Sequence, residues 1–298
     1  MTNRPPYFSV IIPFYNKEAC IEDCLDSILR QDFPRDDYEI ICVNNNSTDN
    51  SASIVKKYPS IKLVHEKIQN AYVARNTGIL NSRGSVMVFT DADTQVPHDW
   101  LGNIYFSIKK NGYDIVIGWY SPGRRIRLLE IHSLLISERI KKAIKEKNPS
   151  MLTAGANNLT IKKEIFEKEG LFLNNSNSED MYLVIRCMIK GYNIGFQDNI
   201  TIKRNDIDSI SILMLKNFIY GCSNAMDIAC KLSFTGKLKY VLITLKFIFR
   251  YFPTGAGLLL FTFSYFTGYI LSKSGLLTPR IIAGFIHKYT LFINKISV

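Results

Sequence analysis

Apolar residues recur at strand and helix spacings over the first two thirds of the chain. Apolar runs ended by polar loops predict four strands, at residues 8–12, 38–43, 61–64 and 86–93. Between the runs the spacing is helical, most clearly in Ile21, Cys24, Leu25, Ile28 and Leu29. Shorter helices are expected around 54–58 and from Asn70 to Gly78. This β-α-β-α-β-α-β order predicts an α/β fold with a doubly wound, mostly parallel sheet flanked by helices.

The fourth apolar run ends abruptly in two carboxylates, Asp91 and Asp93. In an extended strand, residues two apart face the same side, so both carboxylates are expected to point the same way. Ligands of open α/β sheets bind beyond the carboxyl ends of the strands. Two hard oxygen ligands there suit Mg²⁺ or Mn²⁺, which completes its shell with substrate phosphates. The alternative is a solvated turn that caps a following helix, and the surrounding motifs decide between the two.

Further elements are predicted downstream of this run. A fifth strand is expected at Asp114–Gly118 and an amphipathic helix over 128–147. Between them stand Arg124, Arg125 and Arg127, which suit either a loop that closes on phosphates or a solvated basic loop. Later, Ser178-Glu179-Asp180 is a good helix N-terminus, with a capping serine and two acids in the first turn.

Composition and charge narrow the classes of function. The formal net charge of +11 fits a polyanionic partner, whether nucleic acid, an anionic membrane or a phosphate-bearing substrate. Extended disorder is excluded, because 47% of the 298 residues are hydrophobic and no low-complexity tract occurs. The six cysteines form no Cys-x-x-Cys pair, which argues against a zinc site or a disulfide framework. With no signal peptide before the first strand, the catalytic part is expected in the cytoplasm.

The composition changes from about Ser209. Two basic amphipathic helices, at 237–252 and 279–296, flank an uncharged segment at 251–272. Such helices suit an anionic membrane surface, with the apolar side inward and the cations at the headgroups. The uncharged segment is long enough for a single transmembrane helix, but its one proline, its glycines and its hydroxyl residues favour in-plane or re-entrant attachment. Docking of these helices on the catalytic part or on a second subunit is the alternative.

Four blocks in order carry a resemblance to a known family. The blocks are Pro13-Phe14-Tyr15-Asn16, Val43-Asn44-Asn45-Asn46-Ser47-Thr48-Asp49, Ala74-Arg75-Asn76-Thr77-Gly78 and Thr90-Asp91-Ala92-Asp93. Together they resemble the family 2 glycosyltransferases with the GT-A fold, which serve bacterial-type glycan and polysaccharide biosynthesis. The resemblance covers roughly residues 7–205. It implies a nucleotide-sugar donor and inversion at the anomeric carbon.

The resemblance implies roles for individual residues. The residues that would bind the donor are Pro13, Tyr15, Asn44, Asn45, Arg75, Asp91 and Arg204. Among these, Tyr15 offers an aromatic edge to a base, and the fixed guanidinium of Arg75 suits a diphosphate unless it forms only a surface salt bridge. Asp93, together with Asp91, would hold the metal. Asp180, in an acidic pair with Glu179, would be the catalytic base, and residues 153–161 resemble the family's acceptor-side strand.

Two departures from the family pattern stand out. Asn44 and Asn45 occupy a loop that usually carries acids, and an asparagine donates hydrogen bonds that an ionised aspartate cannot. Many relatives also have a histidine near residue 203 that can complete the metal shell, where this chain has Lys203 and Arg204. Either the metal has only carboxylate and phosphate ligands, or the basic pair contacts the diphosphate. With the first departure taken into account, uridine is the favoured nucleoside of the donor, and thymidine and guanosine are its rivals.

The sequence therefore predicts a metal-dependent inverting glycosyltransferase at the cytoplasmic face of the inner membrane, acting on a glycan or a lipid-linked glycan. Residues 1–205 would form the catalytic domain, with nucleotide-sugar binding over about 7–118 and the acceptor side over about 119–205, and residues 206–298 the helical membrane-associating region. Transfer to polyprenyl phosphate is a close alternative, and a catalytically silent module that recruits partners to membranes is one from another class. Nucleic-acid binding is not expected, because the lysines lack an interleaved aromatic platform.

Overall fold

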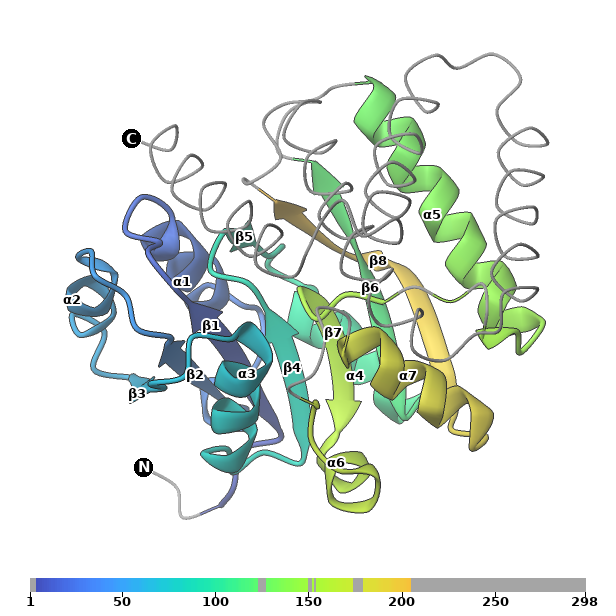
Figure 1. Cartoon of the computed structure of the whole chain (residues 1–298), viewed down its shortest axis with the longest axis horizontal. Coiled ribbons are helices and arrows are strands. Elements are labelled where there is room, and N and C mark those ends of the chain that lie inside the picture. Colours follow the sequence, from blue (N-terminus) through green and yellow to red (C-terminus); the bar gives the residue numbers. More distant parts are fainter. Residues whose placement is uncertain (1–3, 123–126, 150–151, 153, 174–178, 205–298) are drawn as a thin grey trace, which may run out of the picture. The chain divides into compact units, whose positions relative to one another are not determined.

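An eight-stranded mixed sheet organises the part of the chain that the structure describes (Figure 1). The structure is a computed structural model that describes residues 4–122, 127–149, 152, 154–173 and 179–204. The strand order is β3-β2-β1-β4-β7-β6-β8-β5. The strands are β1 (Phe8–Phe14), β2 (Tyr38–Asn44), β3 (Ile61–His65), β4 (Val86–Thr90), β5 (Thr94–Gln95), β6 (Ile115–Pro122), β7 (Asn158–Lys162) and β8 (Ile194–Arg204).

The first four long strands confirm the expected parallel arrangement. β1 lies between β2 and β4 and is parallel to both, and β3 is parallel to β2. Pro13 pairs with Val43, and Ile11 pairs with Phe89. Because parallel strands end at one edge of a sheet, this register brings the loops after β1, β2 and β4 together.

The other half of the sheet contains two reversed strands, so the mostly parallel sheet is mixed. β7 is antiparallel to both β4 and β6, β8 is parallel to β6, and β5 is antiparallel to β8. The reversed direction of β7 places its amino end, where Asn158 pairs with Thr90, at the carboxyl edge of β4. The sequence did not predict β5 or β8, because β5 is only two residues long and a polar stretch, Gln197-Asp198-Asn199, interrupts β8.

Helices cover both faces of the sheet (Figure 1). One face packs against α1 (Ile21–Leu29), α2 (Ser51–Val55) and α4 (Trp100–Lys109). The other packs against α3 (Ala71–Leu80), α5 (Arg127–Lys145), α6 (Lys163–Glu169) and α7 (Glu179–Ile189). A short 3₁₀ helix at Arg35–Asp37 precedes β2. The helices predicted at 21–29, 70–78 and 128–147 are thus confirmed, with ends shifted by a few residues.

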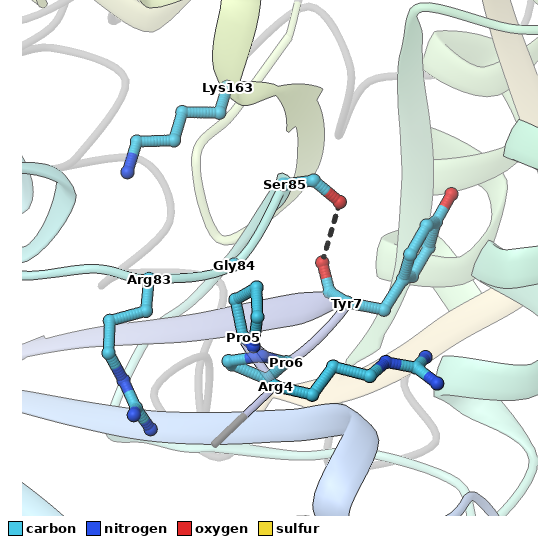
Figure 2. Close-up of a pocket in the computed structure, with 8 residues that line it drawn as sticks. All are labelled: Arg4, Pro5, Pro6, Tyr7, Arg83, Gly84, Ser85 and Lys163. Atoms are coloured by element: carbon cyan, nitrogen blue, oxygen red, sulfur yellow. Dashed lines mark hydrogen bonds between the residues drawn. The ribbon is translucent and has the colours of Figure 1, made fainter.

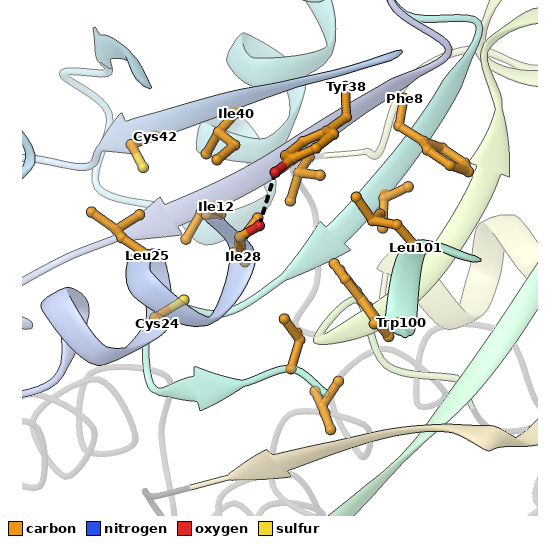
Figure 3. Packing of buried hydrophobic residues seen from close by; sticks show 14 of the residues in the cluster. Phe8, Ile12, Cys24, Leu25, Ile28, Tyr38, Ile40, Cys42, Trp100 and Leu101 are labelled. Atoms are coloured by element: carbon orange, nitrogen blue, oxygen red, sulfur yellow. Dashed lines mark hydrogen bonds between the residues drawn. The ribbon is translucent and has the colours of Figure 1, made fainter. Parts of the chain in front are cut away.

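Strand alternation divides the core between the two faces. In β1, Val10 and Ile12 join the cluster with α1 and α4, whereas Ile11 joins the cluster with α3 and α7. Figure 3 shows the first cluster, in which the Tyr38 hydroxyl donates a hydrogen bond to the Ile28 carbonyl at 3.2 Å. On the other face, α3 approaches β1 so closely that a Cβ on Gly78 would lie 2.4 Å from Ile11 Cγ2. Burial on both faces explains why these strands are continuous apolar runs.

The predicted membrane-associating region, residues 206–298, lies outside the described residues, and so do Arg124 and Arg125 of the basic loop. Arg127 is the first residue of α5. Within the described ranges, no helix is both long enough and apolar enough to cross a membrane. The predicted domain boundary and membrane attachment therefore remain predictions.

Candidate active site

Two loops are joined by hydrogen bonds at the carboxyl ends of β1 and β2. Asn16 has a φ of +48° and Asn46 a φ of +73°, a left-handed conformation that asparagine tolerates better than most residues. Asn16 Oδ1 accepts from the amide of Thr48 at 2.8 Å, and the Asn16 amide donates to Ser47 Oγ at 3.1 Å. The Lys17 amide donates to Ser51 Oγ at 2.7 Å. These bonds hold the two loops as one rim, with Tyr15 half-buried beside it.

Asn44 and Asn45 are buried beneath this rim, and both use their amide donors. Asn45 Nδ2 donates to the Ile68 carbonyl at 2.6 Å. Asn44 Oδ1 accepts from the Ser47 amide at 2.9 Å, while its Nδ2 lies 3.3 Å from His65 Nδ1. An ionised aspartate could not donate to the Ile68 carbonyl. The asparagine departure therefore has a structural reason, since Asn45 fixes the loop that leads into α3.

The Asp-x-Asp segment is a turn rather than the end of a strand. β4 stops at Thr90, and the Thr94 amide donates to the Asp91 carbonyl at 3.2 Å, which closes a four-residue turn. Thr94 Oγ1 donates to the same carbonyl at 2.7 Å. The predicted strand 86–93 therefore ends three residues early, and strand alternation does not apply to Asp91 and Asp93. The turn gives each carboxylate a different partner.

Asp91 pairs with Arg75 of α3. Arg75 Nη2 lies 2.7 Å from Asp91 Oδ1, and Arg75 is only 6% exposed, so the alternative of a surface salt bridge does not hold. Burial lowers the pKa of Arg75, but Asp91, with smaller contributions from Tyr72 and Asp180, raises this pKa by more. Arg75 Nε is buried without a hydrogen-bond partner among the described residues.

Asp93 pairs with a residue that the sequence did not single out. Lys17, three residues after β1, places Nζ 2.6 Å from Asp93 Oδ2. The other carboxylate oxygen, Asp93 Oδ1, is buried and accepts no hydrogen bond from the described residues. The signal for Lys17 was its place just after the Pro13-Phe14-Tyr15-Asn16 block, where a side chain can reach the neighbouring strand end.

Asp180 lies in the first turn of α7 and is 7% exposed, while the adjacent Glu179 is 4% exposed. Three groups of the described residues donate to its carboxylate. The Ala156 amide donates to Oδ2 at 2.7 Å, the Met181 amide to Oδ1 at 2.8 Å, and the Tyr72 hydroxyl to Oδ1 at 3.1 Å. Burial raises the pKa of the Asp180 carboxyl, although Arg75 and these hydrogen bonds oppose the rise.

Helix α3 connects the two acidic centres. Arg75 contacts Asp91 at one side, and Tyr72, one turn earlier, contacts Asp180 at the other. The Arg75 guanidinium carbon lies 5.4 Å from the centre of the Tyr72 ring. No sequence pattern singled out Tyr72, because one tyrosine at the start of a helix fits a packing role equally well.

The strand pair β5 and β8 brings the basic dipeptide to the same turn. Arg204 pairs with Thr94, and Lys203 pairs with Gln95. The backbone of the two basic residues therefore lies beside β5, the short strand that comes directly after the Asp-x-Asp turn. The Lys203 side chain is exposed. Within the described ranges, no group of three or more His, Cys, Asp or Glu side chains could hold a metal. A metal here would therefore depend on carboxylate and substrate oxygens.

A cavity of about 340 Å³ lies at the opposite edge of the sheet, at the amino ends of β1 and β4 (Figure 2). Three of its lining residues, Arg4, Arg83 and Lys163, are cationic, but their side chains point in different directions. Arg4 pairs with Asp37 at 3.0 Å, Arg83 with Glu39 at 3.2 Å, and Lys163 Nζ donates to the Ser82 carbonyl at 3.0 Å. This cavity is not the candidate site.

Comparison with known sequences decides the family. The family described as Glycosyl transferase family 2 matches residues 9–169, more than half of the chain. The chain belongs to glycosyltransferase family 2. This membership confirms the resemblance drawn from the four blocks and the expectation of a glycosyltransferase.

Individual relatives agree with the family. Glycosyltransferase AglE of Haloferax volcanii is 30% identical over 210 residues, which cover 67% of each chain. The mannosyltransferase PcManGT of Pyrobaculum calidifontis, solved with GDP-Man and Mn²⁺, superposes with a TM-score of 0.61 at 18% identity, over 97% of this chain and 81% of that one. Residues 1–349 of S. aureus TarS, solved with UDP-GlcNAc, superpose with a TM-score of 0.52 at 20% identity, over 70% of this chain and 65% of that one. At these identities, the two structures show a shared GT-A-like fold for the family 2 chain.

Proposed function

We propose that this family 2 chain transfers a sugar from a nucleotide diphosphate sugar to a hydroxyl of a glycan or lipid-linked glycan, with inversion and with a divalent metal. The observation that carries the proposal is the buried Asp93 carboxylate, whose Oδ1 has no protein partner among the described residues. An unpaired buried carboxylate oxygen is costly unless a cation binds it. Its position at the carboxyl edge of β4 is where α/β sheets bind ligands.

The residues at this edge fit a bound Mg²⁺ or Mn²⁺. Asp93 would hold the ion, with Asp91 as a second carboxylate, since these hard cations need only one or two carboxylates beside substrate phosphates. The bound metal would neutralise the charge that develops on the departing nucleoside diphosphate. Mn²⁺ in the PcManGT structure supports this proposal.

The rim after β1 and β2 would take the nucleoside. Tyr15 is half-buried there, and Pro13, Asn44 and Asn45 are buried at the ends of the two strands. Arg75 would add positive charge for the diphosphate, as would Arg204, whose backbone pairs with Thr94. The fold neighbours solved with UDP-GlcNAc and GDP-Man support a nucleotide-sugar donor. We favour UDP-sugars, with GDP- and dTDP-sugars as rivals.

Asp180 would act as the general base. As the acceptor oxygen bonds to the anomeric carbon, the bond from that carbon to the diphosphate breaks, and the acceptor proton passes to the Asp180 carboxylate. Burial raises the pKa of Asp180, which makes its carboxylate a better proton acceptor than an exposed one. Glu179, buried beside it, would contribute negative charge at the acceptor side.

A second candidate is transfer to polyprenyl phosphate. Both oxygens of Asp180 already accept hydrogen bonds, three of them from the residues that the structure describes. An acceptor that is already anionic needs no general base. Transfer to polyprenyl phosphate would therefore not be hindered by an Asp180 carboxylate that is occupied by hydrogen bonds. In either case we infer that the enzyme works at the cytoplasmic face of the inner membrane, from the basic amphipathic pattern of residues 237–296.

The test is calorimetric titration of UDP-, GDP- and dTDP-sugars into detergent-solubilised full-length protein, with and without Mn²⁺. Binding that requires metal and selects one nucleotide is the expected result, and it names the donor class. If no nucleotide sugar binds under either condition, the chain is instead a silent module that recruits partners to membranes. For the acceptor, Asp180→Asn distinguishes the candidates, because only transfer to polyprenyl phosphate should survive it.

A further inference from the structure

Tyr72 is the described residue whose side chain donates to Asp180. The other two donors are the backbone amides of Ala156 and Met181, which no side-chain substitution removes. The Tyr72 hydroxyl lies 3.1 Å from Asp180 Oδ1, across 108 residues of sequence, and the contact is buried. Among the described residues, it is therefore the one donor to Asp180 that a side-chain substitution can remove.

The ring of Tyr72 is fixed on two sides, which makes the direction of its hydroxyl well defined. It lies 5.9 Å from the Phe172 ring and 5.4 Å from the Arg75 guanidinium carbon, measured from the ring centre. Asn76, one turn further along α3, holds the backbone of Phe172 through two hydrogen bonds, of 2.7 and 3.1 Å. The helix thus fixes both the tyrosine and the backbone of Phe172, on which its ring packs.

We propose that Tyr72 is a positioning residue for the catalytic base: its hydroxyl holds Asp180 in place and keeps the carboxylate ionised at the acceptor side. This inference rests on the proposed function, because it needs Asp180 to be the base. It adds a residue outside the four blocks that led to the family. Tyr72 itself neither takes the proton nor contacts the donor in this proposal.

The charged and titratable groups around Asp180 decide the sign of the pH effect. From α3 they are Tyr72 and Arg75, and from α7 the neighbouring Glu179. Burial raises the pKa of the carboxyl, and the Tyr72 hydrogen bond opposes that rise. Removal of the hydroxyl should therefore raise the pKa further. On acidification, the rate of the variant should therefore begin to fall at a higher pH than the rate of the wild type.

The experiment measures the pH profile of donor hydrolysis by full-length protein, with water as acceptor and UDP-glucose, UDP-GlcNAc and GDP-mannose as probes. In Tyr72→Phe the acid limb of kcat should move up by about one pH unit, the size of one hydrogen bond to a charged group. At pH values below the acid limb, the variant should therefore be about tenfold slower than the wild type. At pH values well above the limb, the two rates should be similar. The donor dissociation constant should not change.

Tyr58→Phe is the matched control. The Tyr58 hydroxyl donates to Asp26 Oδ1 at 2.9 Å, which is the same kind of bond away from the site. This variant should lose a similar amount of stability without any shift of the acid limb. Thermal melting of both variants shows that each is folded, and the phenyl ring of Tyr72→Phe keeps the packing against Phe172.

The outcomes separate this inference from the proposed function. An unshifted limb in Tyr72→Phe, with an active wild type and an inactive Asp180→Asn, overturns the positioning role alone. An Asp180→Asn variant with the wild-type profile overturns the base assignment and the inference with it. A wild type that hydrolyses none of the three probes, and binds no UDP-, GDP- or dTDP-sugar in the calorimetric titration, overturns both.

Discussion

Lys17 Nζ lies 2.6 Å from Asp93 Oδ2, so the loop after β1 supplies a cation to the turn after β4. The ammonium group occupies one oxygen of the carboxylate that we assign to the metal, and the other oxygen remains without a partner among the described residues. The amine and a divalent ion would therefore compete for one group. Lys17 should lower the apparent affinity for metal and stabilise the protein when metal is scarce.

Replacement of Lys17 by methionine tests this competition. In EDTA the variant should lose about 1–2 kcal/mol of unfolding free energy, at the lower end for a charged hydrogen bond because Lys17 is one third exposed. Half-maximal stabilisation by Mn²⁺ in the presence of UDP should occur at a lower metal concentration. Thermal melts across a Mn²⁺ series measure both effects. Lys162→Met, which removes the 2.7 Å ion pair with Asp114, should leave the Mn²⁺ midpoint unchanged.

Asp93→Asn keeps the shape of the side chain and removes its charge. We expect metal-dependent donor binding to fall below detection, because a neutral amide oxygen is a poor substitute for a carboxylate ligand of Mn²⁺. Calorimetry with Mn²⁺ and the selected nucleotide sugar measures the loss. Asp36→Asn, at an exposed position, serves as the control and should bind as the wild type does. Retained metal-dependent binding in Asp93→Asn would contradict the metal assignment.

Arg75→Met removes a buried guanidinium and leaves Asp91 without its partner. The expected loss of unfolding free energy is about 1.5–3 kcal/mol, the range for a hydrogen bond to a charged group. Arg83→Met breaks an ion pair whose arginine side chain is 68% exposed, and it should cost less than about 1 kcal/mol. Urea unfolding of the two variants gives the comparison. Equal losses would show that burial of Arg75 adds nothing to the strength of its pair.

Asp180→Asn separates binding from chemistry. Loss of a general base should lower kcat about 10²- to 10⁴-fold, while the donor dissociation constant stays the same. Single-turnover transfer and calorimetry on the same preparation measure the two quantities. If donor affinity falls in parallel with the rate, Asp180 supports the architecture of the site rather than the proton transfer.

Alanine substitutions at two glycines should change the unfolding free energy in opposite directions. Gly78→Ala would place a Cβ 2.4 Å from Ile11 Cγ2, and overpacking of this kind costs about 1–3 kcal/mol. Gly102→Ala, in α4, meets no atom within 4 Å and should gain about 0.5–1 kcal/mol because alanine favours a helix. Chemical unfolding of both variants checks the signs. A stabilising Gly78→Ala would contradict the close approach of α3 to β1.

The helices and strands with a clear periodic pattern of apolar residues were the ones that could be predicted well from the sequence. α1 begins and ends where its apolar spacing placed it, at Ile21 and Leu29. The parallel strands β1, β2 and β4 are buried on both faces, so hydrophobic runs marked them directly. The motif loops follow those strands, which is why Asp91, Asp93 and Arg75 could be named from sequence and found near one another.

What the sequence could not supply was geometry that depends on distant segments. The direction of β7 follows from its pairing with β4, some seventy residues earlier, and no local pattern records it. The turn at Asp91–Asp93 depends on hydroxyl and amide bonds from Thr94, which override the strand alternation. The roles of Lys17 and Tyr72 come only from contacts across the fold, at 76 and 108 residues of separation.

The reversed strand β7 also has an evolutionary consequence. The residues that we assign to the donor all precede it, apart from Arg204, whereas Ala156 and Asp180 belong to the segments that enter and follow it. The border between β4 and β7 therefore separates two stretches of the gene. Exchange of the second stretch between relatives would alter the recipient of the sugar without rebuilding the nucleotide side. Chimeras joined between β4 and β7 are thus a natural way to redirect such an enzyme, provided that Tyr72 and Asp180 are kept as a matched pair.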